Sequence, residues 1–104
     1  MPAVARKGGK DSVASPDGSG PGCGSPSTQA TDEGSSNVFV NGIGVVRQGD
    51  RMRSHPEPGC LPHAPALSIQ STTVFVNGRG IGRKDDAYGG SHIISSGSNN
   101  VFAG

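Results

Sequence analysis

The chain has few of the residues that usually build a protein core. It contains no tryptophan and only one tyrosine, and hydrophobic residues make up 31% of its 104 positions. No apolar run approaches the roughly 18 residues of a transmembrane helix. No long segment is free of glycine and proline, which excludes a helical bundle, and the chain is too short for a TIM-barrel or dinucleotide-binding fold. A fold must therefore consist of short strands and turns, with some device replacing a large core.

An excess of charge of one sign is also lacking. Nine Lys and Arg residues stand against eight Asp and Glu residues, and they are interspersed, so we expect no nucleic-acid partner. The first residues carry no apolar signal segment, so synthesis in the cytoplasm is expected. Cys23 and Cys60 are the only cysteines. A reducing compartment favours free thiols or metal ligation for them, with a disulfide as the alternative.

What the sequence does contain is an internal repeat. Residues 35–50 and 71–86 match without gaps at 9 of 16 positions, at an offset of 36, and both contain Val-Phe-Val-Asn-Gly. Residues 98–104 begin the unit a third time, and residues 2–11 resemble its end. Self-similarity of this kind predicts repeated structural units. The chain 1–104 is therefore predicted to be a single domain of three permuted copies, at about 2–34, 35–70 and 71–104.

Each copy predicts a β-hairpin. Val-Phe-Val is a short β run, and Asn-Gly directly after it is the strongest short-range signal for a type I′ turn. The returning arms have few apolar residues, and their glycines permit close backbone approach. Because one copy cannot bury its apolar face alone, the three copies are expected to share one thin core. Residues 12–34 have the composition of a flexible linker.

The repeat units resemble those of the PAAR-repeat family. The similarity is carried by NVFVNG…RQGD (37–50), by TVFVNG…RKDD (73–86) and by the closing string from Ile94 to Gly104, and it covers essentially the whole chain. It implies an all-β fold: a small, loop-rich cone of short β-hairpin repeats with pseudo-three-fold symmetry and a metal-stabilised tip. The chain departs from the family in its RKGGKD and Arg-Lys-Asp-Asp turns, and in having no histidine in the first long loop.

The resemblance also implies a structural function without catalysis. Family members cap the trimeric β-helical spike of phage tails and type VI secretion machines. One monomer would sit on each trimer of a VgrG-like or phage central spike protein, at the spike tip, in transient contact with the target membrane and with possible effector cargo. The apolar residues that recur between copies are expected to serve both the core and this docking surface: Val38, Phe39, Val40, Val74, Phe75, Val76, Val101 and Phe102.

All three histidines and one cysteine lie in loops after the acidic turns. The spacing is His55-x4-Cys60-x2-His63, with His92 later in the chain. Cys-x2-His can chelate one ion, and these loops would meet at the narrow end of the cone. The four residues predict a closed structural site for Zn²⁺, with iron as the alternative ion. Cys23 is the rival fourth ligand, and exposed, incidental histidines are the remaining alternative.

Two other functions stay open at this point. A small metal-dependent hydrolase or toxin would need an open coordination position and a general base. A metal-sequestering protein or effector adaptor would instead exchange its ion reversibly. Asp85 and Asp86 point to opposite faces of an extended chain and form no acid–base pair. Asp86 and Asp50 are expected to stabilise turns and to pair with Arg83 and Arg47.

Overall fold

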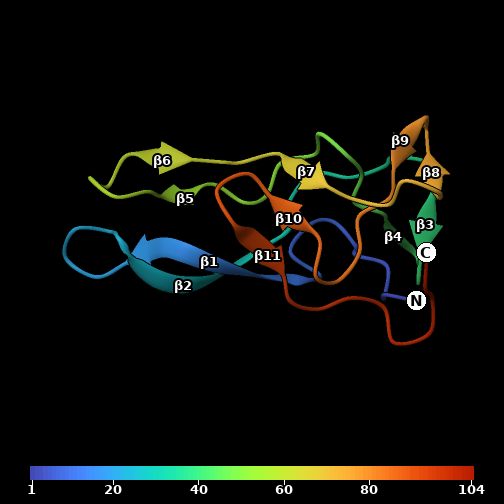
Figure 1. Ribbon diagram of the computed structural model, residues 1–104, viewed down its shortest axis with the longest axis horizontal. Coiled ribbons are helices and arrows are strands. Elements are labelled where there is room, and N and C mark those ends of the chain that lie inside the picture. Colours follow the sequence, from blue (N-terminus) through green and yellow to red (C-terminus); the bar gives the residue numbers. More distant parts are fainter.

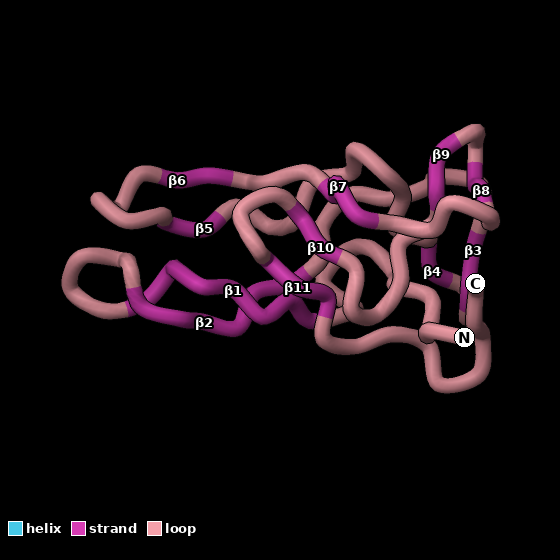
Figure 2. The backbone as a smooth tube through the Cα atoms, in the orientation of Figure 1, coloured by secondary structure: helices cyan, strands magenta, loops and turns pink.

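The computed structural model describes residues 1–104 and contains strands, turns and loops without any helix (Figure 2). The all-β prediction is therefore confirmed, and the chain has no helix that could cross a membrane. The eleven strands are β1 (Ser12–Ser19), β2 (Ser25–Ala30), β3 (Phe39–Val40), β4 (Ile43–Gly44), β5 (His55–Pro56), β6 (Pro62–His63), β7 (Leu67–Ile69), β8 (Phe75–Val76), β9 (Arg79–Gly80), β10 (Ala87–Tyr88) and β11 (His92–Ile94).

The molecule is elongated, with extents of 39 × 23 × 22 Å. Five strands form one antiparallel sheet in the order β2-β1-β11-β10-β7, and β3–β4, β5–β6 and β8–β9 are separate hairpins. The β1–β2 and β5–β6 loops reach one end of the long axis, which we call the distal end (Figure 1). Both termini and the β3–β4 and β8–β9 hairpins lie at the opposite end, which we call the base (Figure 1).

Residues 12–34 form the longest strands of the protein, despite their linker-like composition. In β1 the side chains of Val13, Ser15 and Asp17 are buried, and those between them are exposed. This two-residue period is that of a strand with one covered face. β1 pairs with β2 on one side and with β11 on the other. Backbone pairing and small buried side chains therefore replace the large apolar residues that strand predictions rely on.

Both Val-Phe-Val-Asn-Gly segments form the predicted hairpins. Asn41 and Gly42 have φ values of 55° and 76°, and Asn77 and Gly78 have values of 54° and 76°. Positive φ at both central residues is the requirement of a type I′ turn. In β9, the returning strand of the second hairpin, a Cβ on Gly80 would collide with the backbone carbonyl oxygen of Ser71. These glycines are therefore needed for both turn conformation and close approach.

The three copies are joined by a closed ring of backbone hydrogen bonds. Ala5 N–H donates to Gly82 O at 3.0 Å, and Gly82 N–H donates to Val46 O at 2.8 Å. Val46 N–H then donates back to Ala5 O at 3.0 Å. Each copy thus bonds both others, as a shared thin core requires. Pseudo-three-fold symmetry of the whole molecule stays a prediction, because the extensions that follow the copies differ in length.

The acidic turns contain the predicted ion pairs. Arg47 Nε and Arg83 Nε each lie 2.9 Å from a carboxylate oxygen, of Asp50 and of Asp86 respectively. These hydrogen bonds outweigh burial and raise the pKa of both guanidinium groups. Each aspartate also accepts the backbone N–H of its arginine at 2.8 Å, so it fixes the turn as expected.

The apolar core consists of two small clusters. One lies beneath the five-stranded sheet and includes Met52, Leu67, Tyr88 and Ile94. The other lies at the base and consists of Val4, Val45, Val76, Ile81 and Ala103. The three partly buried valines packed against this second cluster are Val40, Val74 and Val101.

Candidate metal centre

Asp17, His55, His63 and His92 meet at one point between the distal hairpins and β11. The potential ligand atoms of these four residues all lie within 4.8 Å of one another. The Nε2 atom of His55 lies 2.8 Å from Oδ1 of Asp17, 2.9 Å from Nε2 of His63 and 3.1 Å from Nε2 of His92. A cluster of one aspartate and three histidines at these distances could hold a metal ion.

Strand pairing explains why these side chains converge. β5 and β6 pair antiparallel with His55 opposite His63, so both rings project from the same face of their hairpin. Asp17 lies at a buried position of β1, and His92 begins β11, which pairs with β1. Four strands from three separate parts of the sequence therefore each contribute one group.

The outer nitrogens of the rings have acceptors of their own. Nδ1 of His55 is 3.1 Å from the carbonyl oxygen of Arg53, and Nδ1 of His92 is 2.8 Å from that of Gly89. A carbonyl oxygen can only accept, so each Nδ1 carries the proton and leaves Nε2 with a lone pair. These lone pairs point toward one another and toward a carboxylate. A cation between them would remove the repulsion, and such outer partners are usual for metal-binding histidines.

The centre is buried and negatively charged. His55 is 3% exposed and His92 is 1% exposed, whereas His63 is half-buried. Burial favours the neutral carboxyl of Asp17, but hydrogen bonding, led by the bond from Ser15 Oγ, outweighs it and lowers the pKa of Asp17. Asp17 is therefore ionised at neutral pH, and the donor set is three imidazole nitrogens and one carboxylate oxygen.

The prediction of Cys60 as a ligand is wrong, as is its rival Cys23. The two sulfur atoms form a disulfide with the Cα atoms 5.2 Å apart. In the β5–β6 hairpin, the register that places His55 opposite His63 leaves Cys60 in the connecting loop, beyond the ligand pair. The short Cys-x2-His spacing suggested chelation, but the turn directs the thiol toward the β1–β2 loop.

Asp17 is the candidate ligand that sequence reasoning missed. Its segment looked like a linker, and a lone aspartate beside Gly and Pro is typical of a turn. The available signal was the alternation of Val13, Ser15 and Asp17, which has the period of a strand. The structure does bring the three predicted histidines together, and their ligand role stays a prediction.

A groove of about 520 Å³ opens beside the cluster. Its lining includes three ligand residues, Asp17, His63 and His92, together with Arg51 and Glu57. Oε2 of Glu57 lies 3.6 Å from Nδ1 of His63. The groove therefore reaches three of the four residues of the cluster, and the half-buried ring of His63 forms part of its wall.

The recurring apolar residues divide into an inner and an outer set. Val76 belongs to the cluster at the base, and Val40, Val74 and Val101 pack against it. Phe39, Phe75 and Phe102 are 56%, 60% and 50% exposed, and Val38 beside Phe39 is 37% exposed. The three phenylalanines occupy equivalent positions at the starts of the repeat unit, in Val-Phe at 38–39, 74–75 and 101–102, and we call them the phenylalanine triad.

Comparison of the chain with protein-family models and with curated proteins finds no match. The function must therefore be argued from the metal centre, the phenylalanine triad and the repeat.

Proposed function

We propose that this protein is a PAAR-like tip that caps the trimeric β-helical spike of a contractile injection machine. The observation that carries this proposal is the phenylalanine triad, with one half-exposed aromatic ring from each of the three Val-Phe segments at which the repeat unit begins. The motifs at 37–50 and 73–86, which resemble those of PAAR repeats, support it. The protein would act at the spike tip in transient contact with the target membrane.

Docking would bury the phenylalanine triad, which is half exposed in the single chain. Exposed apolar groups that recur at equivalent positions indicate an interaction surface. Burying each half-exposed ring of Phe39, Phe75 or Phe102 would contribute about 1 kcal/mol. Three equivalent contacts match a trimeric partner, so one monomer would cover the end of three chains. Docking would also cover the open strand edges at the end of a β-helix.

The metal centre would brace the distal end. Asp17, His55, His63 and His92 would together provide a closed four-ligand site that suits structural Zn²⁺, with iron as the alternative. A structural zinc ion contributes on the order of 10–16 kcal/mol in small peptides, whereas a whole domain has a net stability of about 5–15 kcal/mol. One ion could therefore replace the large core that this chain lacks.

Docking can be tested by native mass spectrometry with a trimeric spike β-helix. We expect one monomer per trimer. The double variant Phe39→Asp/Phe75→Asp should lose binding, because desolvating two carboxylates opposes docking. Leu61→Asp is the matched control, since Leu61 is 67% exposed in the distal β5–β6 loop. Equal binding of both variants, or a stoichiometry other than one per trimer, contradicts the proposal.

A metal-dependent hydrolase is the second candidate, favoured by the groove beside the centre and by Glu57 within it. Glu57 would be the general base, and a hydrolase would need one of the four ligands to give way to water. Metal-dependent turnover of ester, peptide or glycan substrates that Glu57→Gln abolishes would support this candidate. Its absence in metal-loaded protein, together with trimer binding, would leave the structural role.

A further inference from the structure

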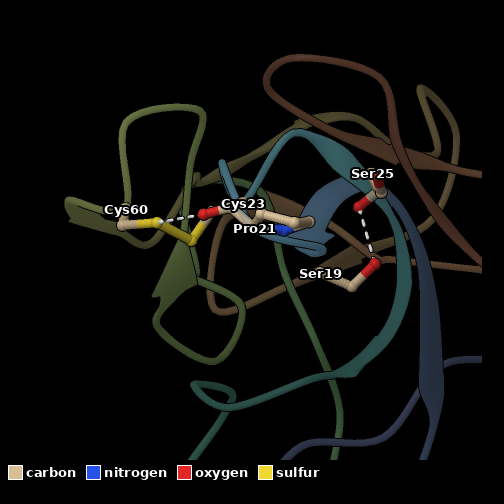
Figure 3. The surroundings of a disulfide bond; sticks show 5 residues. All are labelled: Ser19, Pro21, Cys23, Ser25 and Cys60. Carbon is tan, nitrogen blue, oxygen red and sulfur yellow. Dashed lines mark hydrogen bonds between the residues drawn. A yellow bond between two sulfur atoms is a disulfide. The ribbon is translucent and has the colours of Figure 1, made fainter.

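The disulfide joins the same two hairpins that carry three of the four candidate ligands. Asp17 belongs to β1, and Cys23 lies in the loop between β1 and β2. His55 and His63 belong to β5 and β6, and Cys60 lies in the loop between them. The bond between Cys23 and Cys60 thus connects the two loops at the distal end (Figure 3).

Two similar turns present the cysteines to each other. The sequence Pro-Gly-Cys occurs at 21–23 and again at 58–60. Cys23 N–H donates to Gly20 O at 3.1 Å, and Cys60 N–H donates to Glu57 O at 2.7 Å, so each cysteine closes a turn with proline at its second position. Both cysteines have positive φ, of 60° and 64°. The turns differ at their glycines, since Gly59 has a φ of 94° and Gly22 has no positive φ. The shared sequence, hydrogen bond and cysteine conformation indicate a built junction between the loops.

Few other bonds connect the hairpin tips. β5–β6 is not part of the five-stranded sheet. Gly59 N–H donates to Gly22 O at 3.0 Å beside the disulfide, and Arg53 N–H donates to Ala30 O at 2.9 Å near the start of β5. The relative position of the two hairpins therefore depends mainly on the metal centre and on the disulfide.

We propose that the disulfide controls the affinity of the metal centre, which binds its ion more tightly when Cys23 and Cys60 are oxidised than when they are reduced. This inference rests on the proposed metal-binding role of the cluster. Both bonds close the same large loop of chain. The disulfide spans 37 residues, and Asp17 and His55 are 38 residues apart.

The size of the effect follows from loop closure. If the chain between the ligands is treated as a flexible loop, metal binding in the reduced protein closes 38 residues between Asp17 and His55. In the oxidised protein, the path through the disulfide has only 6 residues from Asp17 to Cys23 and 5 from Cys60 to His55. Because closure entropy scales with three halves of the logarithm of loop length, the oxidised protein should bind the ion roughly six-fold more tightly.

The coupling must also act in the opposite direction. Forming the bond removes two electrons and two protons from the thiols and passes them to a disulfide oxidant such as oxidised glutathione, which becomes two thiols. Linkage requires the bound ion to favour the oxidised pair by the same factor. A six-fold change corresponds to a shift of about 23 mV for a two-electron couple. An ion exchanged readily in a reducing compartment would therefore be retained in an oxidising one.

The affinity for Zn²⁺ alone, measured by chelator competition, tests this coupling in the full chain. We compare oxidised protein, reduced protein and the Cys23→Ser/Cys60→Ser variant. The reduced protein and the variant should both bind about six-fold more weakly than the oxidised protein. Ser25→Ala is the matched control, because Ser25 lies beside the disulfide but contributes no thiol (Figure 3). Its oxidised form should bind like the oxidised wild-type protein.

Each other outcome has a distinct meaning. Equal affinity of the oxidised protein and the serine variant overturns the coupling and leaves the proposed metal centre in place. Tighter binding by reduced wild type than by the serine variant also overturns it, because the thiols would then be ligands. Failure of every form to bind Zn²⁺ overturns the metal centre itself.

A second readout does not depend on metal affinity. The fraction of disulfide in glutathione buffers should rise when Zn²⁺ is added to wild type, and it should not change in Asp17→Asn. An identical fraction with and without Zn²⁺ in wild type contradicts the coupling.

Discussion

The carboxylate of Asp17 accepts a hydrogen bond from Ser15 Oγ at 2.9 Å and lies within 3.2 Å of the rings of His55 and His92. At this scale the chemistry of a side chain depends on neighbours that come from other copies of the repeat. Tyr88 likewise is affected by the charges of Asp50, Asp11 and Asp32, which come from other parts of the chain. Its buried hydroxyl has no hydrogen-bond partner. The effect of substituting each residue can therefore be predicted from its neighbours.

We expect Asp17→Asn to lower the affinity for Zn²⁺ by more than about tenfold, the smallest cost of losing even an outer partner of a metal ligand. The amide keeps the shape of the side chain but removes its charge. Isothermal titration with Zn²⁺ measures the change. Asp32→Asn is the control, because Asp32 is exposed and remote from the cluster residues in sequence. Equal losses in both variants would show a general charge effect instead of ligation.

Tyr88→Phe should leave the free energy of unfolding unchanged or raise it by about 1 kcal/mol, because it removes a buried hydroxyl that has no partner. Urea unfolding at pH 7 provides the measurement. Removal of a hidden stabilising contact would instead appear as a loss of stability.

Stability should also fall at alkaline pH through Tyr88. Burial, with the charges of Asp50, Asp11 and Asp32, raises the pKa of Tyr88 above its ordinary value of 10.0. The folded state thus favours the neutral phenol, and this contribution is present below pH 10 and lost as the pH rises toward the higher folded pKa. Unfolding curves at pH 9 and about 11 should show this loss in wild type and a smaller one in Tyr88→Phe.

At the scale of elements, the sequence predicted the turns that depend on a few neighbouring residues, but not the strands and the disulfide that depend on distant segments. The Asn-Gly turns and the Arg–Asp turns are determined within a few residues, so the sequence predicted them and the structure confirms them. β1 and β2 depend on burial of Val13, Ser15 and Asp17 against distant segments, and composition alone therefore indicated a linker. The disulfide likewise requires two loops, far apart in sequence, to meet at the distal end.

Glycine substitutions in the hairpins separate the need for a positive φ from the need for close backbone approach. Gly42→Ala should cost about 1 kcal/mol or more, because φ is +76° although the space around it is open. Gly80→Ala should cost about 1–3 kcal/mol, because its Cβ would collide with a backbone carbonyl oxygen. Gly22→Ala, with open space and no positive φ, is the control. Thermal unfolding measures all three, and equal melting temperatures would contradict this view of the hairpins.

At the scale of the whole molecule, the two ends are stabilised by different means. The base has the valine-rich cluster, and the ring of backbone hydrogen bonds links it to the cluster beneath the sheet, to which Ala5 and Val46 belong. The distal end has the candidate metal centre and the disulfide. The repeat allowed the base to be predicted from the sequence. The complete set of candidate ligands at the distal end could not be predicted from the sequence. Three histidines stand out in the sequence, whereas Asp17 is one of several aspartates and lies in a segment with the composition of a linker.

Metal removal should therefore affect the two ends unequally. We expect chelation to increase amide hydrogen exchange in β1, β2, β5 and β6, because these hairpins lose the ion that joins them. The amides of Ala5, Val46 and Gly82 in the ring should keep their protection. Hydrogen exchange followed by mass spectrometry resolves the two regions. Uniform deprotection would indicate that the ion stabilises the fold as a single unit.

The ring of backbone hydrogen bonds also constrains when the protein can fold during synthesis. Val4 N–H donates to Val101 O at 3.0 Å, and Ala5 N–H donates to Gly82 O at 3.0 Å. The partners of Val4 and Ala5 thus lie 97 and 77 residues further along the chain. Since contacts of such long sequence separation form slowly, the ring and the base should complete their fold only after Val101 has been synthesised.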